Sequence, residues 1–269
     1  MTDSLRYRLI ATDIDETLFG SDCIISPRTR AAIATAMQRG VIVTLVTGRS
    51  FPTVHTIARE LNLNAPVIIY NGAAICRLSD GQPLFHQPIP SPIARELIAY
   101  ARARGVSPVA FAGTALYSDV PIPLQIAPRS GVLGMTQHIL GNGGAHPDDA
   151  PEKISVIVPS EIAAALSEEL RAQWSRQVCV IQTSPTLLEM VHHTCAKSRG
   201  LAWLGRYLGI SRDQVMAIGD GEADADMLAW AGLGVAMGNA TPSARAASDY
   251  VTATVENAGL AQAIERFVI

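Results

Sequence analysis

Residues 7–18 read Tyr-Arg-Leu-Ile-Ala-Thr-Asp-Ile-Asp-Glu-Thr-Leu, and the interpretation of the chain starts from this stretch. Its apolar first half indicates a short buried strand. Two carboxylates, Asp13 and Asp15, follow at alternate positions. If the strand continues, both share one face; if the chain turns, both still lie at the strand's carboxyl end, where open parallel sheets bind ligands. Two unpaired carboxylates beside an apolar strand cost free energy unless a cation binds them. Mg²⁺, which prefers oxygen ligands, is a suitable cation.

Composition narrows the classes of function that this chain can have. An isolated Asp-x-Asp pair is more often a solvated turn than a metal site. Whether Asp13 and Asp15 bind a metal therefore depends on the residues found elsewhere in the chain. The 269 residues are 48% hydrophobic and 17% charged, which allows one large domain or two modest ones with a sizeable core. The net charge is −3 and no Lys/Arg-rich block occurs, so no nucleic-acid partner is expected. No apolar run is long enough to suggest a membrane partner.

The N-terminal residues and the cysteines both favour a cytoplasmic protein. The first six residues lack the basic-then-apolar build of a signal peptide. Four cysteines are scattered without a Cys-x-x-Cys pair, which fits reduced thiols better than disulfides or a zinc site. The sequence leaves the oligomeric state open between a monomer and a homodimer.

Strand-like and helix-like segments alternate through the first 72 residues. The expected elements are a helix from Pro27 to Gly40, strands at 41–47 and 66–70, and a helix at 51–61. The two strands end in the turns Thr47-Gly48-Arg49 and Asn71-Gly72. This alternation predicts a parallel α/β sheet with all of these turns on one edge.

The middle of the chain follows a different pattern. Four prolines between Pro83 and Pro92 indicate a hinge or linker. Beyond it, two helix–strand–strand modules predict an inserted α+β domain, with a mobile surface loop at 141–151. The expected elements of the insert are helices at 93–104 and 162–172 and strands at 108–112, 115–120, 153–158, 178–182 and 187–191.

The α/β alternation resumes after Thr194. The expected elements there are strands at 215–218, 232–237 and 250–251, helices at 198–208 and 242–247, and helices around Met227 and from Asn257. We therefore expect an α/β core made of residues 1–83 plus 192–269, interrupted by an α+β domain at residues 84–191.

Several polar and charged residues that could take part in catalysis or binding are expected to lie at the same edge of the sheet. They are Asp13 and Asp15, Thr47, Lys197, and Asp220 with Asp224. Carboxylates, a hydroxyl and an ammonium suit the handling of a phosphoryl group, and an aspartate can act as the nucleophile. A carboxylate near a phosphate dianion is repelled by roughly 4 kcal/mol per unit-charge pair at about 4 Å and an effective dielectric of about 20. Mg²⁺ and a lysine ammonium can cancel that repulsion.

Taken together, these motifs resemble those of the haloacid dehalogenase superfamily, in particular its Cof-like phosphatases with a type IIB cap. The resemblance covers nearly the whole chain and implies a Rossmann-like core with a large inserted cap. The four motifs, in order, are residues 13–18, Thr47-Gly48-Arg49, Lys197 and residues 219–228, with Asn71-Gly72-Ala73 matching the turn after the third strand.

By this resemblance, each motif residue has an expected role. Asp13 is the nucleophile, and Asp15 protonates the leaving oxygen and then activates water. Thr47, Gly48 and Lys197 bind the phosphoryl oxygens. Mg²⁺ is held by Asp13, the backbone carbonyl of Asp15, and Asp220. The supporting residues are Asp224, Asn71 and Arg49. Arg49 has two equally plausible roles on chemistry alone, which are contact with a substrate anion and tethering of its own loop.

Three positions depart from the family pattern. Glu16 stands where Gly is usual, Ala223 where Asn is usual, and Ser198 where Gly is common. None removes a nucleophile, a metal carboxylate or the lysine, so the expected protein is a working but slow or specialised phosphatase. Its expected substrate is a small phosphorylated metabolite such as a sugar phosphate, FMN or pyridoxal phosphate. The alternatives are a sugar-phosphate phosphomutase and a non-catalytic protein that binds a phosphorylated ligand.

Overall fold

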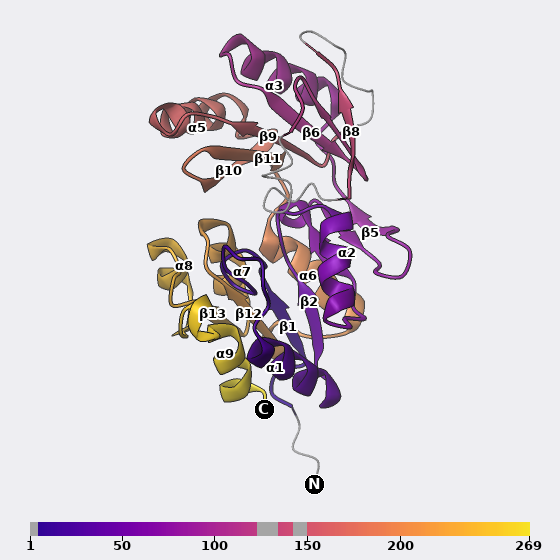
Figure 1. The fold of residues 1–269 in the computed structure, drawn as a ribbon, viewed down its shortest axis with the longest axis vertical. Coiled ribbons are helices and arrows are strands. Elements are labelled where there is room, and N and C mark those ends of the chain that lie inside the picture. Colours follow the sequence, from indigo (N-terminus) through magenta and orange to yellow (C-terminus); the bar gives the residue numbers. More distant parts are fainter. Residues whose placement is uncertain (1–4, 123–133, 142–149) are drawn as a thin grey trace.

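The computed structural model describes residues 5–122, 134–141 and 150–269, which form two lobes stacked along the long axis (Figure 1). The larger lobe contains a five-stranded parallel sheet in the order β14-β13-β12-β1-β2. Its strands are β1 (Leu9–Thr12), β2 (Ile42–Leu45), β12 (Val215–Gly219), β13 (Leu233–Ala236) and β14 (Tyr250–Val251). The predicted parallel α/β core is therefore confirmed.

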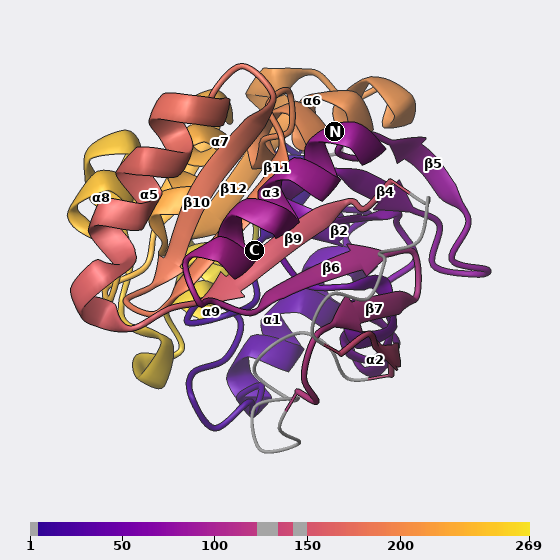
Figure 2. The same cartoon turned by 90° about the horizontal axis from the view of Figure 1, so that it is seen from above.

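Helices cover both faces of this sheet (Figure 2). They are α1 (Pro27–Gln38), α2 (Phe51–Glu60), α6 (Lys197–Leu208), α7 (Ala225–Trp230), α8 (Pro242–Ala247) and α9 (Gly259–Phe267). α1 packs against α9, and α6 packs against α7. All four residues of β1 are buried, as expected for a strand that is covered on both faces. This burial explains why the strand appears in the sequence as a continuous apolar run.

A small antiparallel sheet extends the core beyond β2. A single parallel bridge between Val46 and Ile68 joins the end of β2 to β3 (Val67–Ile69). β4 (Ala74–Cys76) and β5 (Pro83–His86) then pair antiparallel in the order β3-β4-β5. The prediction of a linker from Pro83 is wrong at its start, because Pro83–His86 form a strand that pairs with the core. Proline is tolerated there because it is the first residue of an edge strand.

The inserted lobe is a six-stranded mixed sheet in the order β10-β11-β9-β6-β7-β8, with two helices on the face away from the core (Figure 1). Its elements are α3 (Ser91–Ala103), β6 (Pro108–Ala112), β7 (Ala115–Ser118), β8 (Thr136–Ile139), β9 (Lys153–Ile157), α5 (Ser160–Trp174), β10 (Val178–Ser184) and β11 (Leu187–His192). The predicted α+β insertion is confirmed. The sequence interpretation missed β8, and residues 142–149 of the predicted surface loop lie outside the described residues.

The exact division into domains stays a proposal. We keep residues 1–83 plus 192–269 as the core and 84–191 as the cap, although the pairing of β5 with β4 favours a crossing a few residues after Pro83. The return crossing follows β11, which leads within a few residues into α6. In the described ranges, no helix has the length and apolar character needed to cross a membrane.

Candidate active site

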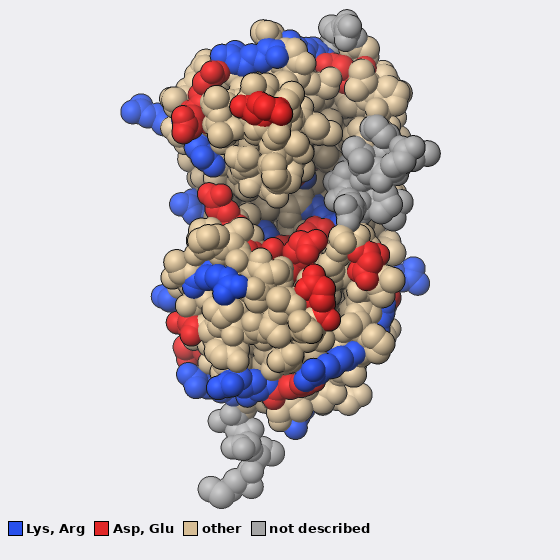
Figure 3. All heavy atoms as spheres, turned by 60° about the vertical axis from the view of Figure 1, so that its left-hand side comes forward, with Lys and Arg blue, Asp and Glu red and all other residues tan. Residues whose placement is uncertain are grey.

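The carboxyl ends of β1, β2 and β12 meet at the edge of the core sheet that faces the cap. Thr12, the last residue of β1, is in register with Leu45 of β2 and with Ile218 of β12. The Asp13 backbone N–H donates to the Ile218 carbonyl at 3.0 Å, so Asp13 is fixed directly after β1. Figure 3 shows acidic side chains gathered around the waist between the two lobes. The predicted convergence of strand ends therefore takes place, although β1 ends before Asp13 and the chain turns there.

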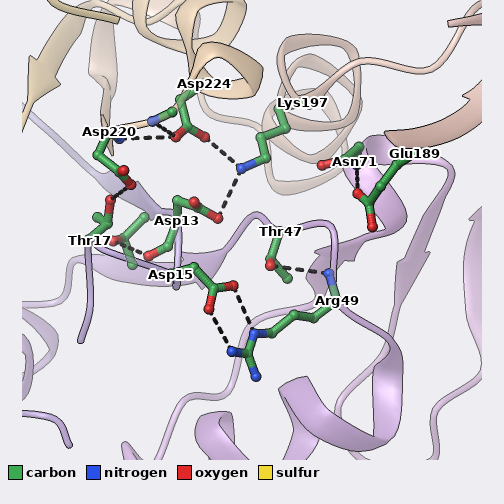
Figure 4. A network of polar contacts seen from close by, with 12 residues as sticks. Asp13, Asp15, Thr17, Thr47, Arg49, Asn71, Glu189, Lys197, Asp220 and Asp224 are labelled. Carbon is green, nitrogen blue, oxygen red and sulfur yellow. Dashed lines mark hydrogen bonds and ion pairs between the residues drawn. The ribbon is translucent and has the colours of Figure 1, made fainter. Parts of the chain in front are cut away.

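Lys197 lies between two carboxylates at the centre of this site (Figure 4). Its Nζ is 2.9 Å from Asp13 Oδ1 and 2.6 Å from Asp224 Oδ1, and all three residues are buried. Burial alone lowers the pKa of Lys197, but the charges of Asp13 and Asp224 outweigh it and raise this pKa above its ordinary value. Burial and the nearby charge of Asp224 raise the pKa of Asp13, with Lys197 opposing them. The lysine thus stays charged and partly neutralises a crowded acidic site.

Both carboxylate oxygens of Asp224 are engaged by the protein. Besides the Lys197 ammonium on Oδ1, its Oδ2 accepts from the backbone N–H groups of Asp220, at 3.0 Å, and Gly221, at 2.8 Å. A side chain at Gly219 would put a Cβ 2.5 Å from the Asp224 carboxyl carbon, so only glycine leaves room for this arrangement. Asp224 therefore links Lys197 to the loop after β12, and its supporting role in catalysis stays a prediction.

Asp220 shares the acidic site with Asp13. Its Oδ1 accepts a hydrogen bond from the Thr17 hydroxyl at 2.7 Å. Burial and the charge of Asp224 raise the pKa of Asp220 to about 7, against the opposing effects of Thr17 and Lys197. Burial and the neighbouring carboxylate both disfavour the ionised form of Asp220, and a bound cation would favour that form.

The cluster fits a divalent metal ion. Asp13, Asp220 and Asp224 each offer a carboxylate oxygen, and these atoms lie within 4.8 Å of one another. Because Asp224 already holds a lysine and two N–H groups, Asp13 and Asp220 are the carboxylates left to bind an ion. A hard cation with few protein carboxylates and room for phosphate oxygens matches Mg²⁺.

Arg49 is paired with Asp15. Its Nε and Nη2 bind the two Asp15 oxygens at 2.9 Å and 2.6 Å, and the guanidinium lies 5.5 Å from the Phe19 ring centroid. The Arg49 side chain is buried, whereas 51% of the Asp15 side chain is exposed. The structure thus pairs Arg49 with the predicted acid–base residue, and contact of Arg49 with a substrate anion stays a prediction.

Thr47, Gly48 and Asn71 lie beside this group, and two cap residues reach them. Asn71 donates its backbone N–H to the Thr47 carbonyl at 2.9 Å and its side-chain Nδ2 to Glu189 Oε2 at 3.0 Å. Lys153 donates to the Gly48 carbonyl at 2.9 Å. The sequence analysis assigned no role to Lys153 or Glu189. The available signal was a charged residue within each of two apolar strands.

The model of the haloacid dehalogenase-like hydrolases matches residues 10–264. The chain belongs to this family. Its fold agrees, because a haloacid dehalogenase-like hydrolase from Bacteroides thetaiotaomicron superposes with a TM-score of 0.84 at 28% identity, covering 97% of this chain and 99% of that one.

Several relatives of this chain are named phosphatases, and two of them show the degree of similarity. An HMP-PP phosphatase of Serratia proteamaculans is 30% identical over 236 residues, which cover 88% of this chain and 85% of that protein. The 5-amino-6-(5-phospho-D-ribitylamino)uracil phosphatase of Bacillus subtilis is 28% identical, and the matched region covers 99% of this chain and 98% of that protein. The chain spans 47% of the length of a further relative, the chloroplastic endoribonuclease YBEY of Arabidopsis thaliana, at 25% identity.

The family model, the superposed structure and the two phosphatases together confirm the expected family, enzyme class and fold.

Glu16 departs from the haloacid dehalogenase pattern at a conformationally demanding position. Its φ is 55°, in the left-handed region that favours glycine, and the Asn239 side chain donates to its carbonyl at 2.8 Å. A residue with a Cβ is disfavoured by about 1–2 kcal/mol in this region, and the greater chain entropy of glycine offsets part of that.

Replacing this residue with the usual glycine should therefore stabilise the protein. We expect Glu16→Gly to raise the free energy of unfolding by about 1 kcal/mol, measured by urea titration in the presence of EDTA. Glu16→Ala is the matched control, because it removes the carboxylate and keeps the Cβ. An equal gain in both variants would assign the effect to charge and contradict the backbone explanation.

Proposed function

We propose that this protein is a Mg²⁺-dependent phosphatase that hydrolyses small phosphorylated metabolites through an aspartyl-phosphate on Asp13. The observation that carries the proposal is the placement of the buried Asp13 carboxylate between Lys197 and the Asp220 carboxylate at the end of β1. A carboxylate held beside a cation can approach a phosphate that would otherwise repel it. The substrate is of the sugar phosphate, FMN or pyridoxal phosphate type.

The first chemical step transfers the phosphoryl group to the protein. An Asp13 carboxylate oxygen attacks phosphorus while the bond from phosphorus to the ester oxygen breaks. The departing oxygen takes a proton from Asp15 and leaves as an alcohol. Because Arg49 holds both Asp15 oxygens in the structure, one of them has to turn toward the leaving oxygen while Arg49 keeps the other.

The second step returns Asp13 to its starting state. A water molecule attacks the phosphorus of the aspartyl-phosphate, and the now ionised Asp15 removes the proton of that water. The bond between phosphorus and the Asp13 oxygen breaks, which releases inorganic phosphate and the free carboxylate. Throughout both steps, Lys197 and the Thr47 hydroxyl hold phosphoryl oxygens, with Lys197 oriented by Asp224.

Asp13, the Asp15 backbone carbonyl and Asp220 would hold the Mg²⁺ ion. When bound, it supplies positive charge that offsets the negative charge of the phosphoryl group and the carboxylates. The cap, which stands over the sheet edge, shields the site from bulk solvent, leaves room for the attacking water and selects the substrate. One of the relatives named above, the 5-amino-6-(5-phospho-D-ribitylamino)uracil phosphatase of Bacillus subtilis, is named for a small phosphorylated compound, which supports small metabolites as the substrate class.

Phosphate release from p-nitrophenyl phosphate tests the proposal. Release that needs Mg²⁺ and stops with EDTA supports a phosphatase. Transfer of the phosphoryl group to a second sugar hydroxyl would instead indicate a mutase. A stable phosphorylated Asp13 without turnover would indicate a protein that only binds or senses a phosphoryl group. A screen of phosphorylated metabolites then identifies the substrate.

The Asp220 carboxyl should make metal binding depend on pH. Its pKa of about 7 in the folded protein lies above its ordinary value of 3.8, so the metal-free folded state binds this proton more tightly than the unfolded state does. The contribution that this bound proton makes to the stability of the metal-free protein is fully present below about pH 4. It is lost as the pH rises through about 7. Mg²⁺ needs the ionised form, so its stabilising effect should grow over the same range.

Thermal unfolding at about pH 5.5 and about pH 8, each with EDTA and with Mg²⁺, measures this effect. We expect the Tm gain from Mg²⁺ to be larger at the higher pH. Asp220→Asn is the control, because it removes the titrating carboxyl and should leave little Mg²⁺-dependent gain at either pH. A wild-type gain that is equal at both pH values would contradict the assignment.

A further inference from the structure

Lys153 and Glu189 form a buried ion pair on the face of the cap sheet that meets the core. The two residues lie on the neighbouring strands β9 and β11, and Lys153 Nζ is 2.5 Å from Glu189 Oε1. Their side chains are 3% and 7% exposed. A buried ion pair gains little net stability unless further hydrogen bonds complete it. Here, the Ser155 hydroxyl of the cap donates to Glu189 Oε1 at 3.4 Å, and two shorter bonds come from the other lobe.

Core groups supply one further contact to each member of the pair. Lys153 donates to the Gly48 carbonyl at 2.9 Å, and Asn71 Nδ2 donates to Glu189 Oε2 at 3.0 Å (Figure 4 shows the Asn71 bond). Lys153 Nζ also lies 4.5 Å from the Phe111 ring centroid in the cap. The Lys153–Glu189 pair therefore connects two cap strands, through hydrogen bonds, to the loops that follow β2 and β3.

These contacts lead directly to the Thr47 hydroxyl. The Gly48–Arg49 peptide is planar, so fixing its carbonyl also fixes its N–H group. That N–H donates to Thr47 Oγ1 at 3.2 Å, while the Asn71 N–H holds the Thr47 carbonyl. With Oγ1 accepting from the Arg49 N–H, the proton of the buried Thr47 hydroxyl is directed elsewhere and can be donated to a phosphoryl oxygen.

Gly48 makes this close approach possible. A Cβ at this position would lie 3.0 Å from Glu189 Oε2 and 3.1 Å from each terminal atom of the Asn71 amide. Any side chain would therefore push the cap carboxylate or the amide away from the loop. The glycine of the Thr-Gly-Arg motif thus has a packing role toward the cap in addition to its expected role toward phosphate.

We propose that Lys153 and Glu189 are positioning residues, through which the cap aligns the Thr47 hydroxyl and the adjacent loop for the phosphoryl group. The inference rests on the proposed phosphatase function, because it needs a phosphoryl group at Thr47. Neither residue contacts the reacting atoms. A cap that moved away from the core would lose both contacts, so the phosphate site is complete only when the cap is seated on the core.

The test is the competitive inhibition constant of inorganic phosphate in the Mg²⁺-loaded, full-length protein. Lys153→Met/Glu189→Gln removes both charges together and so avoids an unpaired buried charge, while the new side-chain amide still offers an acceptor to Asn71. We expect the constant and the KM for p-nitrophenyl phosphate to rise about tenfold, because the Gly48–Arg49 peptide loses its anchor. The kcat value should change less than KM does.

The cap offers a matched control pair. Arg102 binds the Asp119 carboxylate through Nε at 2.9 Å and Nη2 at 2.5 Å, with a buried Asp119, and this pair lies within the cap. Arg102→Met/Asp119→Asn should lower the Tm and leave the phosphate inhibition constant unchanged. A rise of equal size in the control would show a general loss of stability and overturn the inference.

The single variant Glu189→Asp is the second test if the double variant fails to fold. It keeps both charges of the buried pair and shortens the side chain that reaches Lys153 and Asn71, so we expect a smaller rise in the same constant. An unchanged constant in either folded variant refutes the positioning role. Failure of the proposed function is a separate result, because the unmodified protein would then release no phosphate.

Discussion

Asp13→Asn should abolish phosphate release and leave the fold intact. The carboxylate is the proposed nucleophile, and removal of a catalytic nucleophile lowers kcat by about 10⁴-fold or more. The fold should tolerate the change, because burial and the charge of Asp224 already raise the pKa of Asp13 and so favour an uncharged group there. Lys197 keeps Asp224 as its partner in this variant.

Steady-state release of inorganic phosphate and thermal unfolding are measured on the same preparation. We expect no detectable turnover in Asp13→Asn and a Tm in EDTA that is equal to or above that of the unmodified protein. Glu222→Gln, on the exposed side of the loop after β12, is a control for altered surface charge near the site. Turnover within tenfold of the unmodified protein would refute Asp13 as the nucleophile.

Lys197→Met should give the largest loss of stability among these variants. The substitution leaves the buried Asp13 and Asp224 carboxylates without their shared cation. Breaking a buried ion pair by removing one partner costs about 3–5 kcal/mol. We expect a fall of that size in the free energy of unfolding near neutral pH in EDTA, together with loss of phosphate release.

Two comparisons assign the loss to unpaired charge. Arg28→Met removes an exposed ion pair with Glu265, which should hardly change stability because solvent screens it. Lys197→Met/Asp224→Asn removes a carboxylate as well and should recover part of the lost stability, although not the activity. If the double variant is no more stable than Lys197→Met, the charge argument does not hold.

The core and its edge were predictable because their signals are local and repeated. Each parallel strand is a short apolar run that ends in a polar or glycine-bearing turn, and the parallel arrangement then places those turns together. Asp13, Asp220 and Asp224 meet for this reason, although about two hundred residues separate the first from the others. The family motifs added expected roles for these residues, and those roles stay predictions.

The cap–core contacts were not predictable in the same way. Lys153 and Glu189 belong to strands whose partners are set by cap topology, and their core contacts depend on how two lobes meet. The Arg49–Asp15 pair similarly follows from the path of the turn after β1, which periodicity does not describe. β5 was missed because its proline indicated a linker, and β8 because its few residues show no clear alternation.

The pairing of β1 with β12 constrains how this protein folds during synthesis. Leu9 is in register with Val215, so the central strand pair of the core forms only after the ribosome has made more than two hundred residues. The cap, which is contiguous in the chain, can fold first, while β1 and its early partner β2 wait for β12. Expression yield should therefore depend on chaperones that shield those strands, and a product truncated before β12 should aggregate.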